Sequence, residues 1–112
     1  MKATKKLLLG LFCLIPVSAF AGGNLGWMTV DNIVQRECQQ PNQAFEITFT
    51  APHVNPDVCF NSKTVQVNCD HPLYNQMMAI ALTAQAAGSE LSGYVHECDS
   101  DGHAMLRSIK IR

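Results

Sequence analysis

Four cysteines, Cys38, Cys59, Cys69 and Cys98, are the strongest constraint on how this chain of 112 residues folds. They lie 21, 10 and 29 positions apart, so no C-x-x-C pair of the kind found in zinc sites is present among them. In an oxidising compartment, four cysteines in a short chain predict two disulfides, for which three pairings exist. Zinc ligation is the alternative interpretation, and the spacing disfavours it.

The first 21 residues have the features of a secretory signal peptide. Three lysines precede the apolar run LLLGLFCLIPV (7–17), which is too short to span a bilayer, and Ala19 and Ala21 are small residues at the two positions that a signal peptidase reads. A buried N-terminal helix is the alternative, but Pro16 would break it. We therefore expect a signal peptide over residues 1–21, cleavage before Gly22, and an exported protein that is periplasmic or secreted. No later segment is long and apolar enough to span a membrane.

Residues 22–112 are expected to form one small domain, and the signal peptide takes the fifth cysteine, Cys13, with it. Without the three signal lysines, five Lys and Arg side chains remain against nine Asp and Glu side chains, a formal charge of −4. This charge argues against broad electrostatic binding to nucleic acid or to anionic lipid.

Alternating apolar and polar residues predict a mainly β protein with one helix. The predicted strands cover Trp27–Val34, Ala44–Thr50, Lys63–Cys69, Leu91–Glu97 and Ala104–Ile111. Between the third and fourth strands a helix is expected from about residue 71, with Asp70 as a cap and Pro72 in its first turn, to Gly88. The order β-β-β-α-β-β is that of an OB-fold-like five-stranded Greek-key barrel.

This barrel selects one cysteine pairing. In an OB barrel the fourth strand runs antiparallel to the first, so Cys38 and Cys69 end strands at one end of the barrel. Cys59, in the loop between the second and third strands, and Cys98, which ends the fourth strand, lie at the other end. The other pairings would have to span the barrel, which the length of a disulfide forbids. We predict the disulfides Cys38–Cys69 and Cys59–Cys98.

The predicted helix has no charged residue from Pro72 to Gly88 and is apolar on nearly every side. One stripe suits the barrel interior: Leu73, Met77, Ile80, Ala81 and Ala84. The opposite side carries Asn75, Met78, Ala79, Leu82 and Ala86. One interpretation is an alanine-rich helix that tolerates scattered exposed apolar residues. The other, which we favour, is an interface between identical copies that involves Tyr74, Met78, Leu82 and Gln85.

Several segments together resemble a family of small secreted bacterial OB-fold proteins, similar to the binding (B) subunits of pentameric toxins of the pertussis and subtilase-cytotoxin type. These segments are NPDVCF (Asn55–Phe60), the helix pattern over Met77–Gly88, GYVHEC (Gly93–Cys98) and SIKI (Ser108–Ile111), and the resemblance covers roughly residues 45–111.

The resemblance implies a homopentamer or related ring whose helices line a central pore, with a glycan-binding face on the barrel. It also implies a bridge between Cys59 and Cys98, and an exported toxin A subunit is a possible partner. Many chains of this kind are free-standing small proteins, so a monomeric periplasmic protein with a structural or inhibitory role is the alternative.

No constellation of residues predicts catalysis. The cysteines are expected to be oxidised, the serines lie in no G-x-S-x-G context and no motif pairs two carboxylates, so we expect no enzymatic activity and no cofactor. Asp99-Ser100-Asp101-Gly102 with His103 resembles the start of a calcium loop but lacks its other ligands, and we interpret it as a polar turn without metal. The predicted ligand-binding residues are Trp27 and Tyr94, because aromatic faces suit sugar rings; a core position is the alternative for Trp27.

Overall fold

A computed structural model describes residues 22–39 and 42–112, so the predicted signal peptide lies outside the described residues. The elements are β1 (Gly23–Asn24), β2 (Met28–Gln35), β3 (Gln43–Phe49), β4 (Asn61–Asn68), α2 (Tyr74–Ala87), β5 (Glu90–Cys98) and β6 (His103–Ile111). The five long strands and the helix follow the predicted order, with boundaries shifted by one or two residues at most strand ends.

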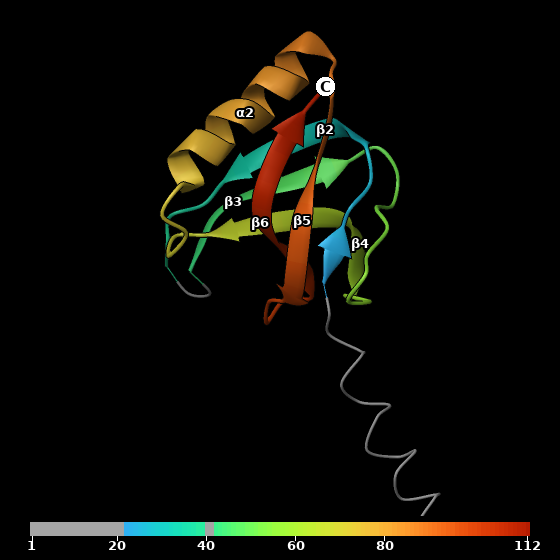
Figure 1. The fold of residues 1–112 in the computed structure, drawn as a ribbon. Helices are drawn as coiled ribbons and strands as arrows, with labels where there is room; N and C mark the ends of the chain where they lie inside the picture. The colour runs from blue at the N-terminus through green and yellow to red at the C-terminus, as the bar shows by residue number, and fades with distance from the viewer. Residues whose placement is uncertain (1–21, 40–41) are drawn as a thin grey trace, which may run out of the picture.

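The strands close into the predicted five-stranded barrel (Figure 1). Neighbours follow the order β5-β2-β3-β4-β6, and β6 pairs with β5 to complete the circle. β4 and β6 are parallel, whereas the other pairs are antiparallel, including β2 with β5 as the disulfide argument required. The short strand β1 was not predicted; it extends the sheet beside β5, where Gly23 lies opposite Val95.

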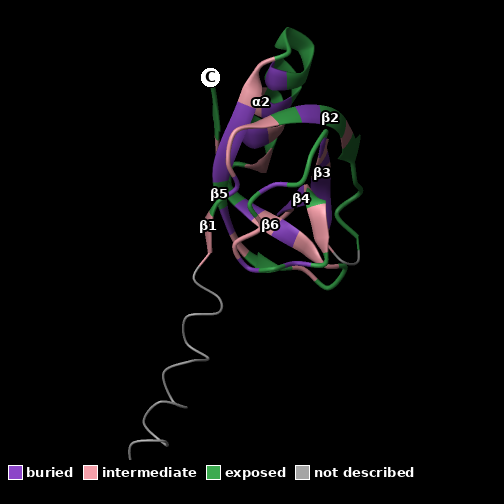
Figure 2. Ribbon diagram, turned by 90° about the vertical axis from the view of Figure 1, so that its right-hand side faces the viewer, coloured by how far each residue is buried: buried purple, intermediate pink, exposed green. Residues whose placement is uncertain are grey.

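Alternation along each strand fills the barrel interior with apolar side chains. Phe45, Ile47 and Phe49 of β3 are fully or almost fully buried, as their period of two predicts. Val65 and Val67 meet them from β4. Figure 2 shows buried stretches along the strands and mostly exposed loops between them. Burial of these side chains is the main source of stability for a domain of this size.

Helix α2 covers one end of the barrel, where it packs chiefly on β2 and β6 (Figure 1). Its buried face consists of Met77, Ala81 and Ala84, which all belong to the predicted inner stripe. The prediction was wrong for Leu73, which is 53% exposed because it precedes the first helical turn.

The predicted start of the helix was also wrong. The helix begins at Tyr74, and its N-cap position is occupied by Leu73, which makes no side-chain capping hydrogen bond, so Asp70 is not the cap. The ring of His71 accepts the N–H of Leu73 through Nδ1 (3.1 Å) and bonds the carbonyl of Arg107 through Nε2 (2.8 Å). This bond to a distant strand holds residues 70–73 in a turn. At the other end, Gly88 adopts the left-handed conformation expected of a helix C-cap.

Both predicted disulfides are present. Cys38 and Cys69 have a Cα–Cα distance of 5.7 Å, and Cys59 and Cys98 one of 5.6 Å, which lies in the ordinary range. Two disulfides in a small domain are compatible with an oxidising, exported location. Of the helices within the described part of the chain, none combines the length and the apolar character needed to cross a bilayer.

Candidate functional site: an apolar loop held by a disulfide

The connection between β3 and β4 exposes three large apolar side chains. Val54 is 68% exposed, Val58 84% and Phe60 91%. We call residues 54–60 the apolar loop. A single exposed apolar residue is ordinary, but three within seven residues form a feature of the surface that requires an explanation.

The apolar loop is held in place by hydrogen bonds and a disulfide. The Asn55 side chain accepts the N–H of Cys59 through Oδ1 (2.8 Å) and donates from Nδ2 to the carbonyl of Cys59 (2.9 Å). Cys59 in turn is bonded to Cys98 at the end of β5. An asparagine that closes a turn in this way removes backbone freedom without any apolar contact. The exposed side chains therefore project from a rigid support.

Asp57 ties the apolar loop to the edge of the barrel. Its carboxylate is buried and accepts the backbone N–H of Gly22 through Oδ1 (3.0 Å) and that of Glu97 through Oδ2 (2.6 Å). One side chain in the middle of the loop thus connects the segment before β1 with the end of β5.

His53 supports the base of the apolar loop from a buried position. It is buried, its Nδ1 accepts the N–H of Asn55 (3.0 Å), and its Nε2 lies 3.1 Å from the carbonyl of Thr64. These contacts fit a neutral imidazole that donates from Nε2 and accepts at Nδ1. Burial lowers the pKa of His53 below its ordinary value, against a smaller raising effect of the Thr64 carbonyl.

The backbone of the apolar loop carries strain at Val58. Its φ is +52°, in the left-handed region that β-branched residues rarely adopt. Asn55 has a similar φ of +55°, but asparagine tolerates this conformation well. A strained, exposed valine whose side chain gains little from packing points to a requirement other than stability.

A second surface feature is a pocket of about 360 Å³ between the β4–α2 connection and β6. Its lining combines polar and apolar groups: Asn68, Asp70, His71, Pro72, Met105, Leu106 and Arg107. A small concave site with a few convergent polar groups is the usual form of a small-molecule site.

The two predicted ligand-binding aromatics lie in different surroundings. Arg112 and Lys110 stand over the ring of Trp27, at 4.4 and 5.2 Å from its centroid. This cation–π arrangement occupies ring surface that a sugar would need. Tyr94 is partly exposed on β5, and its ring stacks on that of His96 with centroids 6.4 Å apart.

The predicted interface residues of α2 occupy two kinds of position. Tyr74 and Met78 are half-buried and pack against the barrel core. Leu82 is 46% exposed, and the exposed Gln85 donates from Nε2 to the carbonyl of Asp31 (3.3 Å). Among the four predicted interface residues, Leu82 is therefore the large apolar side chain that is exposed to solvent. Self-association stays a prediction.

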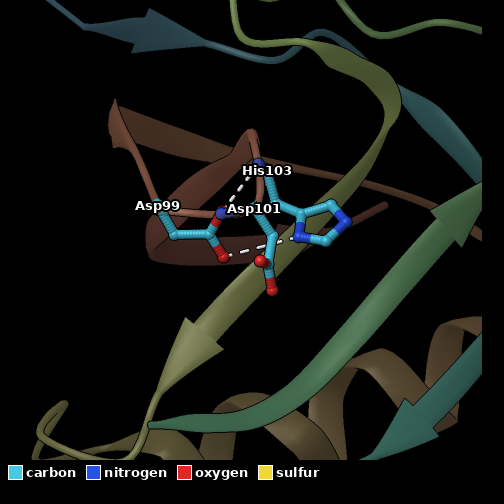
Figure 3. Close-up of side chains that lie close together, drawn as sticks. All are labelled: Asp99, Asp101 and His103. Atoms are coloured by element: carbon cyan, nitrogen blue, oxygen red, sulfur yellow. Dashed lines mark hydrogen bonds and ion pairs between the residues drawn. The ribbon is translucent and has the colours of Figure 1, made fainter. Parts of the chain in front are cut away.

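The hairpin between β5 and β6 brings Asp99, Asp101 and His103 together, with ligand atoms within 4.8 Å of one another (Figure 3). Within the described part of the chain, these three residues could hold a metal ion. His103 Nδ1 lies 3.4 Å from Asp99 and its Nε2 lies 3.4 Å from Glu46, while Gln43 donates to Asp99 (3.0 Å). The donors thus already have partners within the protein, and the network holds the hairpin against β3.

Comparisons of the chain with protein-family models, with curated proteins and with solved structures find no significant match. The resemblance to toxin binding subunits therefore stays a prediction. From the sequence, residues 51–62 are expected to form a loop, and no motif singles out Val58 and Phe60. The order V-C-F does not reveal their exposure, because the two neighbours of a disulfide-bonded cysteine can lie together on one buried face.

Proposed function

We propose that the chain is an exported, non-catalytic binding protein that recognises the surface of a partner protein through the apolar loop. The observation that carries this proposal is the exposure of Val58 and Phe60 on a loop that a disulfide and the Asn55 side chain make rigid. Aromatic side chains contribute strongly to protein interfaces when they fill a pocket of the partner.

Rigidity supports binding because association must overcome the loss of conformational freedom at the interface. The apolar loop has lost most of that freedom before it meets a partner. Phe60 and Val58 flank Cys59, so both side chains start from a backbone that Cys98 anchors. Pro56 restricts the loop further, and Pro52 restricts the segment that leads into it.

The proposal includes export through the signal peptide of residues 1–21, which the two disulfides support. It also includes the absence of catalysis. The toxin-like form of the proposal adds two features. One is self-association into a ring through Tyr74, Met78, Leu82 and Gln85, and the other is an exported A subunit as partner. The monomeric periplasmic protein is its alternative. Light scattering separates the two, since a ring that depends on Leu82 should dissociate in the Leu82→Glu variant.

The pocket beside Arg107 favours glycan binding as a second candidate function. Arg107 and Asp70 offer charged groups at its rim, and Pro72 and Met105 offer apolar surface for a sugar ring. A glycan array with the wild-type protein and the Arg107→Ala variant tests this function. Signals that persist in the variant, or no signal for either protein, would count against the pocket.

Site-specific photo-crosslinking tests the main proposal. A photoreactive phenylalanine analogue at position 60 should give a covalent adduct with a partner on intact cells, and mass spectrometry should identify it. The matched control carries the same analogue at position 73, an exposed apolar position before α2 that lies outside both the apolar loop and the predicted interface. The Phe60→Ser variant should then lose binding to the identified partner, while Leu73→Ser keeps it. Equal labelling from positions 60 and 73 would refute recognition through the apolar loop.

A further inference from the structure

The backbone nitrogen of Gly22 lies against a buried carboxylate. Its N–H donates to Asp57 Oδ1 at 3.0 Å, and the other carboxylate oxygen accepts the N–H of Glu97. Both donors are neutral backbone groups, whereas buried carboxylates are usually stabilised by a positive partner. The surroundings of Asp57 therefore suit a cation at the position of the Gly22 nitrogen.

Only glycine fits at position 22. A Cβ atom there would lie 2.5 Å from the hydroxyl oxygen of Tyr94 and 2.8 Å from the carbonyl oxygen of Val95. Both distances are far below an ordinary contact. The segment before β1 is therefore pressed closely onto β5, and its nitrogen has little freedom to leave Asp57.

A second polar atom near Gly22 lacks a partner. His96 Nδ1 is buried and makes no hydrogen bond within the described ranges 22–39 and 42–112. It lies 2.9 Å from the place that a Cβ of Gly22 would occupy. A peptide N–H can donate one hydrogen bond, and that of Gly22 is used by Asp57. An ammonium group at the same nitrogen has three donors, so it can satisfy Asp57 and still offer a hydrogen to a neighbour.

The sequence places a cleavage point at this same nitrogen. Ala19 and Ala21 mark the bond between residues 21 and 22 as the signal peptidase site, on grounds that owe nothing to Asp57. We propose that cleavage before Gly22 creates an α-ammonium group that forms a buried ion pair with Asp57 and thereby completes the support of the apolar loop. Water adds across the peptide bond, so that Ala21 retains a carboxylate and Gly22 an amine, which takes up a proton.

This pairing makes the apolar loop depend on processing. In the precursor Asp57 accepts hydrogen bonds from neutral groups alone. In the processed chain one of these donors is a positively charged ammonium group, which adds a Coulombic attraction to the hydrogen bond. The inference depends on the proposed export and is independent of what the loop binds.

The first experiment determines the processed N-terminus. The full chain is produced in a bacterial host, collected after export, and its intact mass is measured. A mass that begins at Gly22 is expected, and a different N-terminus would overturn the ion pair even if export and binding both held. A chain that is not exported would refute the proposed export itself.

The second experiment is a double-mutant cycle on processed proteins. One change inserts an alanine between Ala21 and Gly22, so that cleavage after Ala21 moves the ammonium group one residue away; intact mass verifies the new terminus. The other change is Asp57→Asn. The insertion should raise the unfolding equilibrium constant about tenfold when Asp57 is present, and by less than about twofold when it is Asn. An equal effect in both backgrounds would overturn the proposal.

A pH series on the proteins with and without the inserted alanine requires no Asp57 variant. The ordinary pKa of an α-amino group is about 7.7–8.0, and pairing with a carboxylate raises it. The stability advantage of the chain that begins at Gly22 should be complete near pH 7 and disappear as the pH rises above the raised value. Tyr94, His96 and Glu97 are the other titratable groups beside this nitrogen, and both proteins retain them. An advantage that stays constant up to pH 10 would exclude the ion pair.

Discussion

Replacement of Val58 should stabilise the protein, although most surface substitutions have little effect. Val58 has a φ of +52° and an exposed side chain. The backbone conformation of Val58 therefore destabilises the native state, and its side chain contributes little packing in return. A left-handed conformation costs a residue with a Cβ about 1–2 kcal/mol, and asparagine tolerates it better than most residues. We therefore expect Val58→Asn to raise the free energy of unfolding by about 1 kcal/mol.

The glycine variant separates two contributions. Val58→Gly removes the whole conformational penalty, but glycine also gains freedom in the unfolded chain, which costs roughly 0.5–1 kcal/mol. Its net gain should lie between about 0 and 1.5 kcal/mol. In a domain of this size about 1 kcal/mol corresponds to a rise in Tm of about 4–8 °C.

Thermal and urea unfolding followed by circular dichroism measure both effects. Val54→Asn is the matched control, because Val54 is exposed on the same loop but is not among the described residues with a positive φ. It should leave Tm nearly unchanged. If Val58→Asn and Val58→Gly both leave Tm unchanged or lower it, the strain argument is wrong. If the apolar loop binds a partner, the more stable Val58→Asn protein should bind it less well, since the contact surface has been reduced.

Three further predictions concern the support of the apolar loop and the barrel. Replacing Cys59 and Cys98 with serine removes a disulfide that closes a loop of 39 residues. Urea titrations should show a free energy of unfolding lower by about 4 kcal/mol, because the unfolded chain gains conformational freedom. A loss below about 1 kcal/mol would contradict this prediction. Because burial lowers the pKa of His53, the unfolded chain binds more protons than the folded one just below pH 6.5, so stability should fall as the pH decreases through that range. The His53→Gln variant should show a smaller slope in urea titrations from pH 7 to 5, and an unchanged slope would assign the effect to other groups. Gly93→Ala would bring a Cβ to within 2.1 Å of the carbonyl oxygen of Ser108 and should lower the free energy of unfolding by more than about 2 kcal/mol. Gly88→Ala is the control, because a Cβ there meets open space, and it should lower the free energy of unfolding by about 1 kcal/mol. Equal Tm values for these two variants would argue against the close approach of β5 and β6.

The order of the elements and the disulfides could be predicted from the sequence because both depend on local or topological rules. Phe45, Ile47 and Phe49 alternate with polar residues, and a period of two identifies a half-buried strand wherever it lies in space. The pairing of Cys59 with Cys98 followed once the barrel order was known, because a disulfide spans only a short distance.

Other features were decided by contacts between distant segments. Helix α2 begins at Tyr74, three residues after the predicted start, because the ring of His71 bonds to the carbonyl of Arg107 on β6. No local pattern in the sequence reveals that partner. Strand β1 has two residues and no periodicity, and it exists because β5 offers an edge beside it.

Exposure was the property least accessible from the sequence. Val58 and Phe60 look like ordinary apolar residues, and whether they enter the core depends on the rigid turn that Asn55 and Cys59 form around them. In the same way, the helical pattern placed Met78 on the outer side of α2, yet Met78 packs against the core. The reason is that the position of the helix on the barrel determines which of its side chains are covered. Local periodicity determines which elements form. The tertiary structure determines which of their side chains still meet water.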